Sequence, residues 1–256
     1  MLNEERKKKI AQLINEEGIV QIQKLADLFN VSIYTIRRDL NDLEKRGVIR
    51  KTRGGAVRIE KAAWLPTVEE GKKEAAKEKR AIALKALQYI EDTDTIFLMG
   101  STITNIMIPK LQGKKLTVVT NSLDVAAGLC RYDTIETIII GGRVKNYKGN
   151  ILGSKAVEDI RNYYLDKSFI PCGGVNHKYG ITTSTIDSAD LTRTVIKSAG
   201  ENILIADYRK IGRVTFSKVC GISSVSRLIT DDKADKSELE ELQREDIDID
   251  IVSPEE

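Results

Sequence analysis

A cluster of hydroxyl and basic side chains occupies the segment SIYTIRRDL, residues 32–40. Ser32 stands where a helix N-cap is expected, and the apolar residues after it recur at helical spacing: Ile33, Ile36, Leu40 and Leu43. The positions that point away from this apolar face, or flank it, hold Tyr34, Thr35, Arg37, Arg38 and Asn41. Guanidinium groups bind phosphates and hydroxyls bond to base edges, so the combination suits a nucleic acid, although two adjacent arginines alone are usually a solvated surface.

Two further helical patterns precede this segment and would have to position it. The first has apolar residues at Ile10, Leu13 and Ile14 and is expected to end at Gly18. The second carries Ile22, Leu25, Leu28 and Phe29. The turn Asn30-Val31-Ser32 then has the length found between the two helices of a helix-turn-helix motif, whose second helix enters the major groove of DNA.

A basic hairpin is predicted directly after these helices, in VIRKTRGGAVRIE, residues 48–60. Gly47 is expected to end the third helix, and two short β-like runs flank the turn Thr52-Arg53-Gly54-Gly55. The hairpin would carry Arg50, Lys51, Arg53 and Arg58, and a basic wing of this kind adds phosphate or minor-groove contacts. The alternative is a basic three-helix bundle that serves as a protein interaction domain.

Charge is distributed unevenly along the 256 residues. Residues 1–60 hold thirteen Lys/Arg against nine Asp/Glu, whereas the segment from Asp231 onward holds three against twelve, so the nucleic-acid surface is expected at the front. No run of eighteen apolar residues occurs and MLNEERKKK leads into no apolar core, which predicts a cytoplasmic protein without a membrane span or secretory signal. We expect no cofactor and no metal, and three reduced cysteines: Cys130, Cys172 and Cys220.

The rest of the chain alternates between strand-like and helical patterns. After a first domain at 1–58, residues 59–72 are predicted to be a linker with Trp64 as an aromatic anchor, and residues 73–256 a second domain. Helices are expected from Lys73 to Ile90 and near 104–111, 123–130, 155–164, 187–199 and 237–244. The strand-like runs predict an α/β domain with a mostly parallel sheet; they are TIFLM, LTVVT, ETIIIG, KSFIPC, NILIAD, RLITD and IDIDIV.

Small and polar residues follow six of these seven strands. In open α/β sheets ligands bind outside the carboxyl ends of the strands, where glycine permits close approach of the backbone and helix N-termini favour anions. The pattern therefore predicts a site for a phosphorylated small molecule, although each loop alone could be an ordinary turn or helix cap. The strand ends are Gly100-Ser101-Thr102, Thr120-Asn121-Ser122, Gly141-Gly142-Arg143, Cys172-Gly173-Gly174, Asp207 and Asp231.

The stretch LADLFNVSIYTIRRDLNDLEKRGVIRKTRGGAV resembles the N-terminal signature of the DeoR family of bacterial transcriptional regulators. The resemblance continues through TNSL, GGRV, DKSF, GGVN, GITT, LIADYRKIG and LITDD, and so spans nearly the whole chain. It implies a winged helix-turn-helix domain followed by a sensor domain related in fold to ribose-5-phosphate isomerase. It further implies a regulator, most often a repressor, that binds double-stranded operator DNA. Because a single recognition helix has limited specificity, a homodimer or homotetramer is expected. The DNA contacts implied are Ser32, Tyr34, Thr35, Arg37, Arg38, Arg50, Lys51 and Arg53.

The same resemblance implies a phosphorylated sugar-like effector and a regulated operon of carbohydrate metabolism. Its effector residues, by position, are Ser101, Thr102, Thr104, Asn121, Gly142, Arg143, Gly174, Thr183, Asp207 and Lys210. The chain departs from the family pattern at Met99, Ile103, Ser188 and Thr192, which removes two carboxylates and a cation from the expected pocket. The alternative is a sugar-phosphate isomerase-like enzyme, for which Asp207 and Lys210 would be base and electrophile. The one histidine, His177, is expected to be a surface loop residue.

Overall fold

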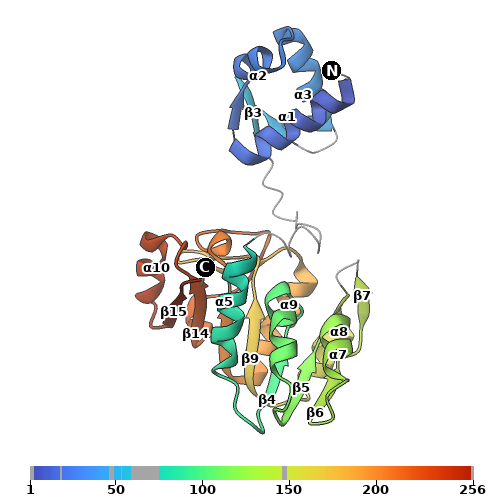
Figure 1. Ribbon diagram of the computed structural model, residues 1–256, viewed down its shortest axis with the longest axis vertical. Helices are drawn as coiled ribbons and strands as arrows, with labels where there is room; N and C mark the ends of the chain where they lie inside the picture. Colours follow the sequence, from blue (N-terminus) through green and yellow to red (C-terminus); the bar gives the residue numbers. More distant parts are fainter. Residues whose placement is uncertain are drawn as a thin grey trace. The chain divides into compact units, whose positions relative to one another are not determined.

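The chain folds as two compact units, Met1–Lys61 and Ala62–Glu256, shown in Figure 1. The computed structural model describes residues 3–17, 19–45, 49–52, 54–58, 75–145 and 149–254. The expected linker at 59–72, with Trp64, lies outside these residues, as do Gly18, Gly47 and Arg53.

The first unit is a winged helix-turn-helix. Its helices are α1 (Asn3–Glu17), α2 (Ile22–Phe29) and α3 (Ile33–Lys45). Its antiparallel sheet has the order β1-β3-β2, with bounds Ile19–Gln21, Ile49–Lys51 and Gly55–Arg58 for β1, β2 and β3. The three predicted helices and the hairpin are confirmed, whereas β1 was not predicted because three residues are too few to show an alternating pattern. Gly55 allows the close β1–β3 contact, since a Cβ there would lie 2.1 Å from the carbonyl oxygen of Val20.

The turn between α2 and α3 follows from local backbone chemistry. Asn30 adopts a left-handed conformation, φ 49°, and the amide of Val31 donates to the carbonyl of Ala26 at 3.1 Å, which closes α2. The hydroxyl of Ser32 accepts from the amide of Thr35 at 3.1 Å, as predicted for an N-cap. Ile33 departs from the predicted buried stripe: it is 40% exposed because it lies in the first turn of α3, before the helix reaches the core.

The second unit is built on a seven-stranded sheet in which every neighbouring pair is parallel. Its order is β15-β14-β12-β9-β4-β5-β6. All seven predicted strands belong to it, so the predicted fold class is confirmed. In chain order the strands are β4 (Thr95–Leu98), β5 (Leu116–Thr120), β6 (Ile135–Ile139), β9 (Leu165–Pro171), β12 (Ala199–Ile205), β14 (Arg227–Asp231) and β15 (Asp248–Val252).

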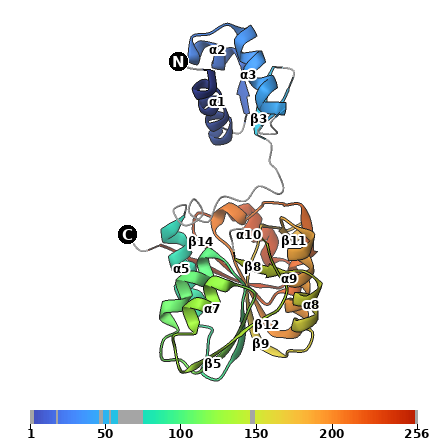
Figure 2. The ribbon, with the colours of Figure 1, turned by 90° about the vertical axis from the view of Figure 1, so that its right-hand side faces the viewer.

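Helices cover both faces of this sheet. Figure 2 shows α5 and α7 on one side and α8 and α9 on the other. One buried cluster joins the sheet to α5 (Ala76–Leu87), α6 (Thr102–Met107) and α7 (Leu123–Leu129). The opposite cluster joins it to α8 (Ser154–Ile160), α9 (Ile186–Ser198) and α10 (Lys236–Gln243).

Several short elements lie outside the main sheet. They were not predicted from the sequence because they are too short to show a periodic pattern. A hairpin pairs β7 (Arg143–Lys145) with β8 (Asn150–Leu152). A small antiparallel sheet contains β10 (Gly174–Asn176), β11 (Gly180–Thr183) and β13 (Ser217–Cys220). Three 3-10 turns complete the described elements: η1 (Ile108–Lys110), η2 (Tyr208–Lys210) and η3 (Ile222–Ser224).

The strand order reverses between β4 and β9. From β4 the chain adds β5 and β6 on one side, and from β9 it adds β12, β14 and β15 on the other. Phe97 of β4 pairs directly with Ser168 of β9 across this boundary. Such a switch point leaves a crevice at the carboxyl ends of the strands, where α/β proteins bind their ligands.

Candidate nucleic-acid interface and effector cavity

The outward face of α3 carries Tyr34, Arg37 and Arg38. These positions are three and four residues apart and so share one side of the helix. Tyr34 is 79% exposed and both arginines are exposed. Within the described part of the chain, neither arginine has a hydrogen bond or ion pair, so a polyanion would displace no internal partner.

The inward face of α3 is fixed to α1 by ion pairs. Arg6 donates from Nε to Asp39 Oδ2 at 2.6 Å and from Nη2 to Asp39 Oδ1 at 3.3 Å, and Asp39 is 1% exposed. The hydrogen bond to Asp39 raises the pKa of Arg6 above its usual value. Lys7 adds a second bridge to Asp42 at 2.7 Å. Basic residues of α1 thus orient α3, while the arginines on its other side stay exposed.

The remaining expected DNA contacts have mixed surroundings. The hydroxyls of Ser32 and Thr35 lie 2.9 Å apart at the exposed start of α3. Lys51 donates from Nζ to the amide oxygen of Asn41, and its backbone N–H donates to Glu44 Oε1 at 2.8 Å, so the wing strand is tied to α3. The side chain of Arg50 and all of Arg53 lie outside the described residues.

A cavity of about 250 Å³ lies at the carboxyl ends of β4, β5, β9 and β12, the four central strands on either side of the switch point. It brings together six of the ten expected effector residues: Ser101, Thr102, Asn121, Thr183, Asp207 and Lys210. The positions that depart from the family pattern also line it: Met99, Ile103, Ser188 and Thr192.

Two of the expected effector residues have a structural place beside this cavity instead of lining it. Thr104 is fully buried, its hydroxyl donates to the carbonyl of Met99 at 2.9 Å, and it forms a reciprocal cap with Ser101 at the start of α6. Gly174 lies in β10, where a Cβ would come within 2.3 Å of the carbonyl oxygen of Arg213. Hydrogen bonding explains the threonine, and close packing explains the glycine.

Gly142 and Arg143 also lie outside the lining of the cavity. They follow β6, the edge strand of the sheet, which is separated from the switch point by β5 and β4. Gly142 has φ +141°, a conformation suited to glycine, and the Arg143 side chain is 75% exposed and pairs with Asp187 at 3.3 Å. Asp231, the last residue of β14 on the other flank, accepts from the amide of Tyr208 at 2.8 Å and so holds η2 in place.

Charge in the cavity is concentrated after β12. Asp207 is 2% exposed and accepts from Arg209 Nε at 2.8 Å and Nη2 at 2.9 Å. Burial opposes ionisation, but the hydrogen bond from Arg209 and the charges of Arg209, Lys210 and Lys79 outweigh it, and the pKa of Asp207 lies below its usual value. Burial lowers the pKa of Lys210, with the carboxylate of Asp207 acting in the opposite direction.

Several lining residues were not predicted from the sequence. Lys79 comes from the first turn of α5, where a lysine in an Ala/Lys/Glu helix looks like any surface position. Arg209 could have been found from its place between Asp207 and Lys210. Asn105 and Asn150 are contributed by α6 and β8, and neither carries a signal in the sequence.

Backbone and amide contacts brace the loop after β4. The amide of Gly100 donates to Asn121 Oδ1 at 3.0 Å, and Asn121 Nδ2 donates to the carbonyl of Ile151 at 3.3 Å. Asn150 Nδ2 donates to the carbonyl of Gly100 at 3.3 Å, and a Cβ on that glycine would lie 2.2 Å from Asn150 Oδ1. Asn121 therefore shapes the cavity through bonds to the backbone.

The sequence predicted reduced cysteines and a histidine at the surface. All three cysteines are free thiols, as expected, and burial raises the pKa of Cys172 in the cavity wall to about 12. His177 lies at the surface and its Nδ1 is 2.9 Å from Glu238 Oε2. Across the described residues there is no group of three or more His, Cys, Asp or Glu side chains placed to hold a metal ion.

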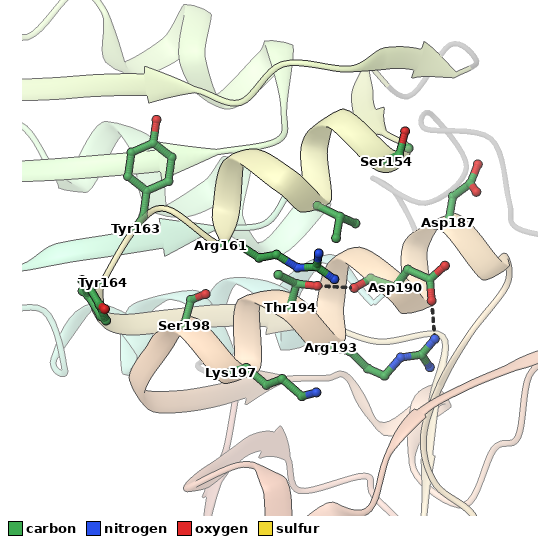
Figure 3. A pocket seen from close by; sticks show the side chains of 12 residues that line it. Ser154, Arg161, Tyr163, Tyr164, Asp187, Asp190, Arg193, Thr194, Lys197 and Ser198 are labelled. Atoms are coloured by element: carbon green, nitrogen blue, oxygen red, sulfur yellow. Dashed lines mark hydrogen bonds and ion pairs between the residues drawn. The ribbon is translucent and has the colours of Figure 1, made fainter.

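A wider groove of about 710 Å³ lies between α8 and α9. Figure 3 shows Tyr163 and Tyr164 at one end and Asp187 at the other. Arg193 in this groove is already bound to Asp190 and to the carbonyl of Lys218. The smaller cavity at the switch point is the better candidate for a ligand because buried charges of both signs converge there.

An exposed basic recognition helix in one unit and a ligand-sized cavity in a parallel α/β unit define a DNA-binding transcriptional regulator with a small-molecule sensor. Two family models match the chain: the DeoR-like helix-turn-helix domain over residues 6–62 and the DeoR C-terminal sensor domain over residues 74–232. The chain therefore belongs to the DeoR family, as its sequence resemblance implied. No described helix has both the length and the apolar character that crossing a membrane requires.

Named relatives match nearly the whole chain, and a solved structure matches about half of it. A protein of Bacillus subtilis (strain 168) named "Uncharacterized HTH-type transcriptional regulator YulB" is 32% identical over 98% of this chain and 98% of its own. The lactose phosphotransferase system repressor of Staphylococcus aureus (strain NCTC 8325 / PS 47) is 30% identical over 90% of this chain and 93% of its own. Ribose 5-phosphate isomerase A of Methanocaldococcus jannaschii superposes with a TM-score of 0.39 at 14% identity, over 54% of this chain and 55% of that one.

Proposed function

We propose that the protein is a cytoplasmic repressor of a carbohydrate-metabolism operon, released or retained on its operator by a phosphorylated sugar-like effector. The observation that carries the proposal is the cationic cavity at the switch point of the sensor sheet. The similarity to a relative named as a lactose phosphotransferase system repressor supports the repressor role and the link to carbohydrate metabolism.

In this proposal the phosphate binds on the cationic side of the cavity. Lys79, Arg209 and Lys210 all line it, and Asp207 holds the Arg209 guanidinium with two hydrogen bonds. A cation that is already positioned loses little conformational freedom when a phosphate arrives. The hydroxyls of Ser101, Thr102 and Thr183 would contact the remaining polar atoms of the ligand.

At the operator, α3 would lie in the major groove. Its contacts would be Ser32, Tyr34, Thr35, Arg37 and Arg38, and the wing would add Arg50, Lys51 and Arg53 on the phosphates. One short helix reads few base pairs, so we expect a homodimer or homotetramer whose half-sites lie about 10 base pairs apart or at multiples of that spacing.

The effector would act by binding two arrangements of the protein with different affinity. Lys79 is relevant because it lies in the first turn of α5, four residues after the first described residue of the sensor unit. A ligand that contacts Lys79 therefore acts on the first described helix of the sensor unit.

The test is the affinity of the full-length protein for the promoter region of the neighbouring operon, at fixed salt, with and without a panel of sugar phosphates. We expect one compound to change operator affinity at least tenfold, about 1.4 kcal/mol of coupling. Lys210→Met should abolish this response and retain operator binding. Lys197→Met, an exposed lysine on α9, is the matched control and should respond like the wild type. Equal responses from both variants would contradict the proposal.

The runner-up is an isomerase-like enzyme, favoured by the presence of Asp207 and Lys210 in one cavity. A general base needs a carboxylate free to take a proton, and both oxygens of Asp207 are bound by Arg209. Turnover of ribose 5-phosphate by the full-length chain would favour the enzyme over the regulator.

A further inference from the structure

The seven-stranded sheet ends in two edge strands, β15 and β6, on opposite sides (Figure 1). An edge strand presents unpaired backbone N–H and C=O groups to which another strand can bind, and proteins commonly protect such edges with charged residues or proline. β15 is protected in this way. It carries Asp248 and Asp250, which would bring like charges close together if two β15 strands paired, and Pro254 follows its end.

β6 lacks this protection. It contains a single charged residue and consists of Ile135, Glu136, Thr137, Ile138 and Ile139. Ile139 is 42% exposed and Ile138 is half-buried, whereas the aliphatic residues of the neighbouring β5 are buried. Leu123, on the helix α7 that packs on β6, is 43% exposed and enlarges the apolar surface beside the strand.

The direction of the backbone groups of β6 follows from its bonds to β5. The N–H of Ile140 donates to the carbonyl of Thr120 at 3.1 Å, and the carbonyl of Thr134 accepts from the first residue of β5 at 3.3 Å. Backbone groups of successive strand residues point to opposite sides, so even-numbered residues bond toward β5, and Thr137 and Ile139 point their N–H and C=O groups away from it. Among the described residues these outward groups have no backbone partner.

A second copy of this chain offers the matching edge. Two identical strands that pair antiparallel across a two-fold axis form an isologous contact, in which each copy supplies the groups that the other needs. With the axis at Thr137, the N–H of Ile139 lies opposite the C=O of Ile135 of the second copy. Glu136 then lies opposite Ile138, so no like charges face one another in this register.

We infer that two copies of the protein associate through β6, whose antiparallel pairing joins their sheets into one continuous sheet. The inference deepens the proposed function by naming the surface of the expected homodimer, and it rests on that function for the role of the dimer at the operator. Stable dimers bury roughly 800 Å² per partner, more than one short strand provides, so apolar residues beside β6 such as Leu123 would add to the contact.

The test compares Ile139→Pro with Ile251→Pro in the full-length protein. Both positions are exposed isoleucines of an edge strand with an outward N–H, because the N–H of Asp248 and the C=O of Val252 bond toward β14. Proline there breaks no bond of the sheet and removes only the donor offered to a partner strand. In sedimentation equilibrium at micromolar concentrations we expect a wild-type dimer, a dissociation constant raised at least about tenfold in Ile139→Pro, and a change within about twofold in Ile251→Pro.

Two further measurements keep the test independent of folding. If thermal unfolding shows a lowered midpoint in Ile139→Pro, Ile139→Lys takes its place with Ile251→Lys as control, since lysine keeps the N–H and puts a charge on the edge. Hydrogen exchange of the wild type reports on the N–H groups themselves. Those of Thr137 and Ile139 should be protected where the protein is dimeric and should exchange after dilution to the monomer.

The possible failures are separable. A wild type that stays monomeric would overturn the inference. Dimers that survive in Ile139→Pro, or that dissociate equally in Ile251→Pro, would place the interface elsewhere and overturn it, while the proposed function would stand. If the wild type dimerises through β6 but no sugar phosphate changes its operator affinity, the proposed effector control falls and the inference stands.

Discussion

The outward surface of α3 and the effector cavity treat charge in opposite ways. On α3, Arg37 and Arg38 are exposed and have no partner within the described residues. In the sensor cavity, Asp207 is buried and bonded twice to Arg209, and Lys210 lies beside them. The α3 surface keeps these cations in water, whereas the cavity pairs a buried carboxylate with a partly buried arginine.

The difference reflects the partners that each surface suits. DNA is a polyanion that gives up condensed counterions to any set of exposed cations, so its binding needs no buried charge and weakens with salt. A small ligand offers few contacts, and binding it well requires groups that are already oriented. Disturbing the cavity charges should therefore destabilise the sensor unit, whereas removing an exposed arginine of α3 should leave the DNA-reading unit folded and weaken only its binding.

The largest effect is expected from Asp207→Ala. Removing the carboxylate leaves Arg209 and Lys210 facing one another in a buried site, which should lower the free energy of unfolding of the sensor unit by about 3 kcal/mol. Urea unfolding measures it, with Asp187→Ala as control. Asp187 pairs with the exposed Arg143, and its loss should cost less than about 1 kcal/mol.

The pH dependence of the same variant gives an independent check. The pKa of Asp207 in the folded protein lies below its unfolded value, so its stabilising contribution is complete above about pH 4 and is lost as the pH falls through the folded pKa. The stability difference between wild type and Asp207→Ala should therefore shrink below about pH 4. A difference that stays constant to pH 2 would show that the ionised carboxylate is not the stabilising form.

Arg38→Ala should leave unfolding unchanged and weaken operator binding about tenfold, about 1.4 kcal/mol. Fluorescence anisotropy with labelled operator at fixed salt measures the affinity, and effector binding should be unaffected. Lys9→Ala removes the same charge from α1 and is the control, with an expected loss of less than about threefold. If the two variants lose equal affinity, α3 has no special role in DNA binding.

Ser32→Ala removes the N-cap of α3 and should destabilise the DNA-reading unit by about 1 kcal/mol, because the amide of Thr35 loses its acceptor. Ser32→Gly should cost only a few tenths of a kcal/mol, since a residue without a Cβ leaves the freed amide more open to water. Thermal unfolding of both variants checks the ranking. An unchanged midpoint in Ser32→Ala would mean that the hydroxyl contributes nothing as a cap.

The smallest effect is expected at Arg143. Its side chain is 75% exposed and lies outside the cavity, so Arg143→Ala should change stability by less than about 0.5 kcal/mol and leave effector affinity within twofold. Titration with the effector provides the measurement. A tenfold loss of affinity would return Arg143 to the site and show that the cavity extends to the end of β6.

The sequence predicted the large elements because their patterns are long. Runs such as LTVVT and NILIAD are apolar enough to be strands buried on both faces, and each became part of the parallel sheet. Ser32 was predicted correctly as a cap because its chemistry is local. The three-residue β1 and the β7–β8 hairpin were missed because three residues do not show a period.

The cavity was harder to predict because strand order is a property of the whole sheet. Gly142 and Asn121 both follow apolar strands and look equivalent in the sequence, yet β5 lies one strand from the switch point and β6 lies at the edge. Lys79 was missed for a different reason. It does not follow a strand in the sequence, and only the packing of α5 brings it to the cavity. Residue type at strand ends predicts candidates, and topology selects among them.

The β4–β9 pairing also has a consequence for the order of folding. Ile96 pairs with Lys167, so the centre of the sensor sheet joins residues about seventy positions apart, and neither wall of the cavity is complete before both strands exist. The DNA-reading unit closes on contacts within its first sixty residues. During synthesis from the N-terminus, domains fold as they emerge, and local contacts form fastest. Each new molecule should therefore gain its α3 surface first, and it passes through a stage at which it has a DNA-reading head and no sensor.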